Sequence, residues 1–306
     1  MPEEFYDIAK RVNNWGRWGE KDERGTVNLI TDEAVREAAR STRTGRRFSL
    51  ALPLSANGPQ TGVIPGRINP LRTMLCINVP FTGDSQQFCT SDDVVTMGLQ
   101  AATHWDALAH VSYDGRLYNG FPAASITAFG ATHCGIDKIG PLLGRGVLLD
   151  IPRAKGVERL DPGYAITPED LDEAQELART EVRSGDIVLL RTGQGQLLAE
   201  GDRDSYGTPS PGPSLAAAEW FHRHDVAAVA TDNLTFEVFP CEFDDAPLAV
   251  HLLHLVEMGL TQGQNFHLEE LAADCADDGV YTFLLEASPE PFAGAVGAPV
   301  NPIAIK

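Results

Sequence analysis

The spacing of apolar residues divides the chain into strand-like and helix-like segments. Short apolar runs bounded by turn residues predict seven strands, at 46–54, 72–79, 92–100, 146–151, 186–193, 226–232 and 280–287. Apolar residues at helical spacing predict helices at 30–40, 167–180, 214–224, 247–259 and 267–275. One helix start is well marked, because Thr167 can cap it, Pro168 suits its first position and acidic residues follow.

The order of these segments indicates the fold class. The first third of the chain is rich in strands, and the later part alternates strand and helix. This order predicts an α/β or α+β fold in which sheets pack together and helices lie outside. We find no repeat and no low-complexity linker, and the Trp- and Gly-rich opening is typical of an ordered loop. We therefore predict an N-terminal arm at 1–31 and a single domain at 32–306.

Composition and charge narrow the partners and the compartment. The net charge of −19 argues against nucleic acid and against an anionic membrane surface, since both need clustered Lys and Arg. No apolar stretch approaches the roughly 18–20 residues of a membrane span. The acidic N-terminus does not resemble a signal peptide. We expect a cytoplasmic protein whose five scattered cysteines are free thiols.

Candidate chemistry is concentrated in the segment QAATHWDALAH at 100–110. It contains His104, Asp106 and His110 within seven residues, with Gln100 four residues before His104. Imidazole and carboxylate groups suit Zn²⁺, Mn²⁺ or Fe²⁺, and a further histidine can serve as a base toward metal-activated water. A satisfied His–Asp pair in the core is the alternative, and the spacing alone leaves both interpretations open.

This segment resembles the hallmark of the cyclase family that includes bacterial kynurenine formamidase and isatin hydrolase. The hallmark is His-x-Gly-Thr-His-x-Asp-x-Pro-x-His; Thr103, His104, Asp106 and His110 match it, whereas Gln100 replaces its first histidine. The likeness extends from about Trp15 to Ile305 through further blocks, which are WGRWGEKDERGTVNLIT (15–31), HVSYDGRLYNG (110–120), GDIVLLRTG (185–193) and AVGAPVNPIAI (295–305).

The resemblance implies a swivelling β/β/α domain, assembled as a dimer or tetramer, that hydrolyses amide or lactone bonds. It implies a metal site at Gln100, His104 and Asp106, with His110 and a downstream carboxylate acting on the nucleophilic water. In the segment 247–271, it places His251 and Gln264 at the remaining ligand positions. His254 takes the place of His251 if the register shifts by one helical turn.

Two glutamines distinguish this chain from the family pattern. Gln100 and Gln264 replace an imidazole and a carboxylate by neutral amides, which are weaker ligands for Zn²⁺. The resemblance with these departures implies one divalent ion, Mn²⁺ or Zn²⁺, rather than two. A metal-free site is the alternative, in which Asp106 and His110 perform acid–base chemistry and a glutamine donates to an oxyanion.

Several other residues are candidates for contacts with substrate. Trp15, Trp18 and Trp105 can form an aromatic pocket or pack the N-terminal arm, and Tyr113 can donate to a substrate oxygen. Asp232 and Glu237 follow a predicted strand, where α/β folds often place site residues, and Asp232 is the one we select. The remaining histidines are expected to be structural, namely His133, His222, His224 and His267.

Three functions follow from this sequence. The favoured one is metal-assisted hydrolysis of an amide, formamide or lactone in a small cyclic or aromatic molecule, catalysed by a homo-oligomer. The second is a cyclase or dehydratase that acts on a secondary-metabolite intermediate resembling a polyketide. The third is a catalytically decayed member that only binds a small molecule, a hypothesis motivated by the two glutamines.

Overall fold

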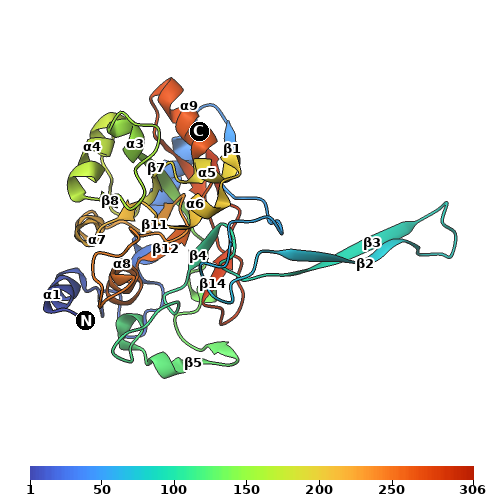
Figure 1. Cartoon of the computed structure of the whole chain (residues 1–306), viewed down its shortest axis with the longest axis horizontal. Coiled ribbons are helices and arrows are strands. Elements are labelled where there is room, and N and C mark those ends of the chain that lie inside the picture. Colours follow the sequence, from blue (N-terminus) through green and yellow to red (C-terminus); the bar gives the residue numbers. More distant parts are fainter.

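The chain forms a mixed α/β fold around a curled, half-barrel sheet of nine strands (Figure 1). The structure is a computed structural model that describes all 306 residues. The strand order is β1-β15-β13-β7-β9-β11-β12-β4-β14. Neighbours among β7, β9, β11 and β12 run parallel, while the strands on both flanks pair antiparallel. The predicted α/β class is confirmed.

The sheet strands are β1 Arg47–Ser49, β4 His104–Asp106, β7 Leu143–Asp150, β9 Ile187–Arg191, β11 Ala228–Thr231, β12 Thr261–Gln264, β13 Thr282–Glu286, β14 Gly297–Pro299 and β15 Ile303–Ile305. Three two-stranded ribbons accompany the sheet, namely β2 Leu71–Pro80 with β3 Cys89–Thr96, β5 Ile126–Thr127 with β6 Gly130–Ala131, and β8 Ala165–Ile166 with β10 Gly212–Pro213. These ribbons are the only other sheets. No second sheet therefore packs on the large sheet, and the predicted packing of sheet on sheet is wrong.

Helices cover it instead. The α-helices are α1 Glu3–Val12, α2 Asp32–Arg40, α3 Ile151–Ala154, α4 Pro168–Ala178, α5 Gly195–Glu200, α6 Arg203–Gly207, α7 Leu215–Arg223, α8 Ala249–His251 and α9 Glu269–Asp278. A π-helix, η5 Leu252–Met258, continues α8, and four 3₁₀ turns lie at η1 Gly25–Leu29, η2 Tyr118–Gly120, η3 Ala123–Ser125 and η4 Ile136–Lys138. Every helix predicted from apolar spacing is present.

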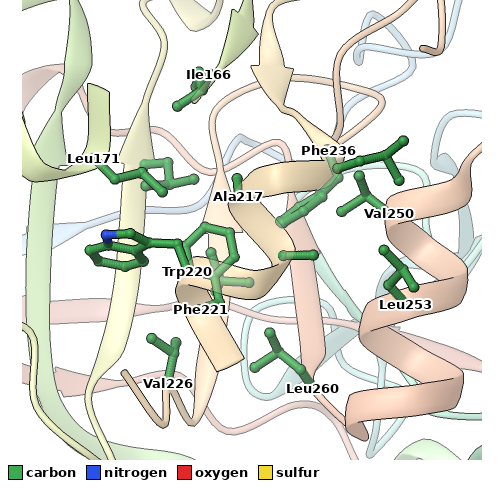
Figure 2. Close-up of a cluster of buried hydrophobic side chains, with 14 of the residues drawn as sticks. Ile166, Leu171, Ala217, Trp220, Phe221, Val226, Phe236, Val250, Leu253 and Leu260 are labelled. Atoms are coloured by element: carbon green, nitrogen blue, oxygen red, sulfur yellow. The ribbon is translucent and has the colours of Figure 1, made fainter. Parts of the chain in front are cut away.

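Both faces of the sheet are buried, as expected for its parallel centre. In β7, the side chains of Val147 and Leu149 join one hydrophobic cluster, and Leu148 between them joins the other. The first cluster lies under α1, α4, α7 and η5, and Figure 2 shows Trp220 of α7 directed toward Leu171 of α4 and away from Val250 and Leu253. The second cluster lies under α9.

The N-terminal arm contains a helix that we did not predict. Residues 1–31 were expected to form an ordered loop, but α1 buries Phe5, Ile8, Ala9 and Val12 in the first cluster. These positions follow helical spacing, so the signal is present but short. The arm therefore shares a core with the rest of the chain.

One ribbon stands apart from the body. Strands β2 and β3 pair only with each other and project from the sheet as a long hairpin (Figure 1). The sequence predicted both strands but not their isolation. No helix in the chain has the length and apolar character needed to cross a membrane. All five cysteines are free, as predicted.

Candidate active site

Strand β4 directs His104 and Asp106 to the same face of the sheet. Successive side chains of a strand alternate between faces, so residues two apart share one face. Trp105 consequently points the other way, where it is fully buried against Phe266 with ring centroids 5.2 Å apart. Its Nε1 donates to the carbonyl oxygen of Ala287 at 2.8 Å. The structure thus places Trp105, a predicted substrate contact, in the core.

The strands on either side of β4 complete its polar face. Gln264 of β12 is opposite His104, and its Nε2 donates to Asp106 Oδ2 at 2.8 Å. Gly297 of β14 is opposite Asp106. A Cβ at Gly297 would lie 2.5 Å from Gln100 Nε2, so a glycine is needed here to leave room for the Gln100 amide.

The His104 imidazole is held in one tautomer. Its Nδ1 lies 2.7 Å from the carbonyl oxygen of Ala102, which also accepts from Asn265 Nδ2 at 3.0 Å. Because a carbonyl can only accept, Nδ1 carries the proton and Nε2 keeps a free lone pair. That Nε2 is buried without a hydrogen-bond partner and lies 3.4 Å from Asp106 Oδ1, which also has none.

Two further imidazoles face the same carboxylate. His110 Nε2 lies 3.7 Å from Asp106 Oδ1, and His251 Nε2 lies 4.0 Å from Asp106 Oδ2. His110 is in the turn that follows β4, and its side chain is 19% exposed, against 7% for His251 and 1% for His104. The site is therefore most accessible from the side of His110.

These contacts determine the charges in the site. Burial raises the pKa of Asp106, but the facing imidazoles, chiefly that of His110, outweigh burial and hold that pKa well below its usual range. Burial lowers the pKa of His110, and the charge of Asp106 offsets only part of this effect. Asp106 is thus a carboxylate near neutral pH, and His110 is a neutral imidazole.

Glu237 is a site residue that the sequence interpretation did not select. It accepts hydrogen bonds from His251 Nδ1 at 2.5 Å and from the backbone N–H groups of Val250 and His251 at 3.0 Å. These bonds fix the His251 ring with Nε2 toward Asp106. Glu237 lies in the loop after β11 and has no sequence motif of its own.

Asp232, the residue that we selected from the sequence, lies away from the group of histidines around Asp106. Its two carboxylate oxygens accept from the backbone and hydroxyl of Thr192 and from the backbone of Gly193, at 2.7–2.9 Å. It is fully buried, and burial raises its pKa. Asp232 therefore holds the loop after β9, and these bonds do not reach the histidine group.

Arg67 also lies near the site without a sequence signal. Burial lowers the pKa of Arg67, and the charge of Asp106 partly restores it. The same guanidinium lowers the pKa of His110. A Cβ at Gly98 would lie 3.3 Å from Arg67 Cγ, so Arg67 packs against the chain just before Gln100.

The other predicted substrate contacts belong to the packing of the N-terminal arm. Trp15 Nε1 donates to the carbonyl oxygen of Val256 at 2.7 Å, and the Tyr113 hydroxyl bonds to Glu257. The ring of Trp18 lies 4.8 Å from the Arg17 guanidinium carbon. None of these contacts involves the histidine group.

The side chains around Asp106 include candidate ligands for a metal ion. No three His, Cys, Asp or Glu side chains of the chain are arranged to hold one. His104 Nε2 and Asp106 Oδ1 are nevertheless buried atoms without partners, as is the amide nitrogen of Gln100 beside them. His104 Nε2, Asp106 Oδ1 and the amide oxygen of Gln100 are together the candidate ligands for one divalent ion.

The site offers no comparable set of ligands for a second metal ion. Asp106 Oδ2 already accepts from the amide of Gln264, and that NH₂ group cannot ligate a cation. His254 does not substitute for His251, because it is fully buried beside Phe221 and Phe236 with Nδ1 3.1 Å from Gln262 Oε1. His251, and not His254, is therefore the histidine of this helix that faces Asp106.

The chain belongs to the cyclase family. The profile of the family described as "Putative cyclase" matches residues 48–238. The crystal structure of a novel cyclase is 40% identical, covers 96% of this chain and 100% of its own, and superimposes with a TM-score of 0.88. The resemblance inferred from QAATHWDALAH is thereby confirmed. A search of the curated proteins gave no match.

More distant structures share the fold. Isatin hydrolase A from Labrenzia aggregata is 17% identical, with coverage of 85% of this chain and 93% of its own, and a TM-score of 0.61. A structure described as a potential metal-dependent hydrolase with cyclase activity is 16% identical, with coverage of 85% and 98% and a TM-score of 0.54. At these identities the likeness concerns the fold alone.

Proposed function

We propose that this protein hydrolyses an amide, formamide or lactone bond in a small cyclic or aromatic molecule, with one divalent metal ion. The observation that carries the proposal is the convergence of His104, His110 and His251 on Asp106, in which Asp106 Oδ1 and His104 Nε2 are buried and unpaired. Unpaired buried polar atoms are costly, so their retention supports a ligand or reactant between them.

The metal has a defined part in this proposal. A divalent ion held by Gln100, His104 and Asp106 would supply a bound water of lowered pKa and polarise the scissile carbonyl. Mn²⁺ and Zn²⁺ both accept such a set of one imidazole, one carboxylate and one amide oxygen. The isatin hydrolase and metal-dependent hydrolase folds support this class of chemistry.

His110 is the proposed base. A neutral His110 with its proton on Nε2 directs that N–H toward Asp106 and leaves Nδ1, which has no partner, free to accept a proton from water. The imidazolium that forms is stabilised by the Asp106 carboxylate. The same proton then passes to the leaving nitrogen or oxygen, which completes the bond cleavage.

Two further residues support the reaction. Glu237 keeps the His251 ring oriented toward Asp106. The charge of Asp106 raises the pKa of Arg67, and the charge of Arg67 in turn lowers the pKa of His110. Hydrolysis of an amide or lactone releases a carboxylate, and a guanidinium at this position suits its binding.

One observation favours a metal-free variant of this chemistry. Gln264 binds Asp106 through its amide NH₂, which satisfies a carboxylate oxygen without any cation. In that case Asp106 and His110 act as the acid–base pair, and Gln100 donates to the developing oxyanion. A ring-closing or dehydrating reaction would use the same base.

A substrate panel with a chelator control tests the proposal. Isatin, an N-formyl arylamine and an aromatic lactone are incubated with protein loaded with Mn²⁺ or Zn²⁺, or stripped of metal, and the products are identified by mass spectrometry. We expect hydrolysis of at least one substrate class, seen as a ring-opened product one water heavier from isatin or the lactone, or as free arylamine and formate from the N-formyl arylamine. We expect this product to be lost on chelation or in His104→Ala. Equal rates in loaded protein, stripped protein and His104→Ala would refute the metal-assisted mechanism.

A further inference from the structure

A cavity of about 480 Å³ lies between the segment 52–59 and the helices α5 and α6. Pockets of this size hold small organic molecules. Figure 1 shows α5 and α6 next to each other on the body of the molecule. None of the residues that we assign to the metal ion or to the proton transfer lines this cavity. The proposed reaction therefore leaves it without a role.

The cavity lies on the opposite side of the sheet from the group of histidines around Asp106. Gln196 of α5 donates to Glu269 of α9 at 3.1 Å, and α9 covers the second hydrophobic cluster. Trp105 belongs to that cluster, whereas strand alternation directs His104 and Asp106 to the other face. A molecule bound beside α5 is thus separate from a substrate bound at Asp106.

The charge of the cavity differs from that of the chain. None of its twelve lining residues is acidic, although the chain carries a net charge of −19. Arg203 lines it and forms no ion pair; its Nη2 donates to the carbonyl oxygen of Gln60 at 3.1 Å, and its Nε is buried without a partner. The neighbouring carboxylate of Asp202 instead accepts from the backbone of Ser205 at 3.1 Å. The guanidinium charge is therefore not neutralised by the chain.

His267 provides a second polar group in the cavity. Its backbone N–H donates to the carbonyl oxygen of Leu50 at 2.8 Å, which fixes its position, and its half-buried ring has no hydrogen-bond partner in the chain. An imidazole presents at least one N–H donor in either protonation state. Arg203 and His267 can thus both donate to an anion between them.

The loop that forms one wall of the cavity is held in shape. Asn69 accepts from the backbone N–H of Gln60 at 3.0 Å and donates to its carbonyl oxygen at 2.8 Å. Gln60 Nε2 donates to the carbonyl oxygen of Ala101 at 2.9 Å. A Cβ at Gly58 would lie 2.6 Å from Asn69 Oδ1, so a glycine lets the loop close on that amide. A preformed wall lowers the ordering cost of binding.

We propose that this cavity binds a small organic acid, with its carboxylate at Arg203 and His267 and its apolar body against Leu52 and Leu198. Guanidinium groups bind carboxylates through planar N–H donors. The apolar walls favour an acid with a hydrocarbon or aromatic body over an inorganic anion. The inference goes beyond the proposed hydrolysis and does not depend on it, because this site needs neither the metal ion nor the proposed base.

Isothermal titration calorimetry of the full chain with 2-naphthoate and octanoate tests the proposal, and 2-naphthamide is the neutral analogue. Arg203→Gln removes the positive charge, and Ala199→Trp fills the cavity from α5. Arg223→Gln is the matched control, because Arg223 is an exposed arginine of α7 that also forms no ion pair. His104→Ala distinguishes this site from the one at Asp106.

We expect at least one of the two acids to bind wild type, Arg223→Gln and His104→Ala alike, and Arg203→Gln about 10- to 100-fold more weakly. Binding should be lost in Ala199→Trp, and the amide should bind wild type more weakly than naphthoate by a similar factor. Circular dichroism checks that each variant is folded.

Three results would overturn the proposal: no binding of either acid to wild type, equal affinity in wild type and in the cavity variants, or loss of binding in His104→Ala. Loss in His104→Ala would place the acid at Asp106 instead. Because hydrolysis is measured as product and this site as binding, the failure of one leaves the other standing.

Discussion

Gln264 donates its side-chain amide to Asp106 Oδ2 across the antiparallel pair of β12 and β4, at 2.8 Å. This contact gives the two oxygens of one carboxylate different surroundings. Oδ2 has a neutral donor, whereas Oδ1 is buried without a hydrogen-bond partner between His104 and His110. The free oxygen is where we place the metal ion and the chemistry.

Replacing the Gln264 amide tests whether the two oxygens of Asp106 have these different roles. In Gln264→Glu, two carboxylates meet in a buried site, and their repulsion destabilises the fold unless a cation lies between them. We expect metal-stripped Gln264→Glu to unfold several degrees below wild type, and added Mn²⁺ or Zn²⁺ to recover most of that loss. Thermal unfolding with and without metal measures this. Gln264→Leu is the control, because it removes the amide without adding charge and should not respond more strongly to metal than wild type.

Substitutions of Glu237 and Asp232 should have different effects: the first should lower activity, and the second should lower stability. Glu237→Gln weakens the bond that orients His251, and we expect kcat to fall about 10- to 100-fold with little change in KM. Asp232→Asn lacks the second carboxylate oxygen that accepts from Gly193, and we expect it to cost about 1–3 kcal/mol of stability. Steady-state kinetics and denaturant unfolding of both variants measure the two effects. A Glu237→Gln enzyme with wild-type kcat would contradict this account of His251.

Gly297 should be intolerant of a methyl group. In Gly297→Ala, the new Cβ would lie 2.5 Å from Gln100 Nε2 and 2.9 Å from the carbonyl oxygen of Trp105. We expect a loss of about 1–3 kcal/mol in stability and weaker metal binding, because Gln100 is displaced. Gly195→Ala is the matched control, since its nearest contact is 3.5 Å and its position opens α5. Calorimetry of metal binding and unfolding should show the loss at Gly297 alone.

His254 should make stability depend on acid pH. Burial, with the charge of His251, lowers the pKa of His254 to about 3. The unfolded chain binds a proton at this residue below its usual pKa of about 6.5, while the folded chain does not, so stability falls as pH drops from there toward 3. The slope is about 1.4 kcal/mol per pH unit.

The measurement compares wild type with His254→Gln. Between pH 6.5 and 5.0, wild type should lose about 2 kcal/mol more unfolding free energy than the variant, by urea titration at each pH. Parallel losses in the two proteins would show that His254 does not carry this dependence.

The sequence predicted the parts of the fold that depend on local pattern. The buried runs of β7, β9 and β11 and the capped helix α4 follow directly from apolar spacing and from Thr167 with Pro168. Helix α1 was missed because its apolar face is short and directly precedes a segment rich in Trp and Gly. The apolar run of β2 has the pattern of a buried strand. Its exposure could not be predicted, because periodicity indicates a strand but not which elements cover it.

The site divides in the same way. His104 and Asp106 share a face because a strand alternates, which the spacing within HWD already permits. Strand alternation could not identify Glu237 and Arg67, because both lie in loops outside the segment 100–110 and neither belongs to a motif. Trp105 was misplaced for the opposite reason. Its position between two site residues suggests proximity, but alternation directs it to the core.

We propose His110 as the group that moves the proton in hydrolysis at Asp106. The most direct measurement is kcat/KM of wild type and His110→Ala, on the substrate that the panel identifies, with saturating metal and equal metal content. We expect kcat/KM to fall about 10²- to 10⁴-fold in His110→Ala, with the metal still bound. A His110→Ala enzyme that retains wild-type kcat/KM would contradict it.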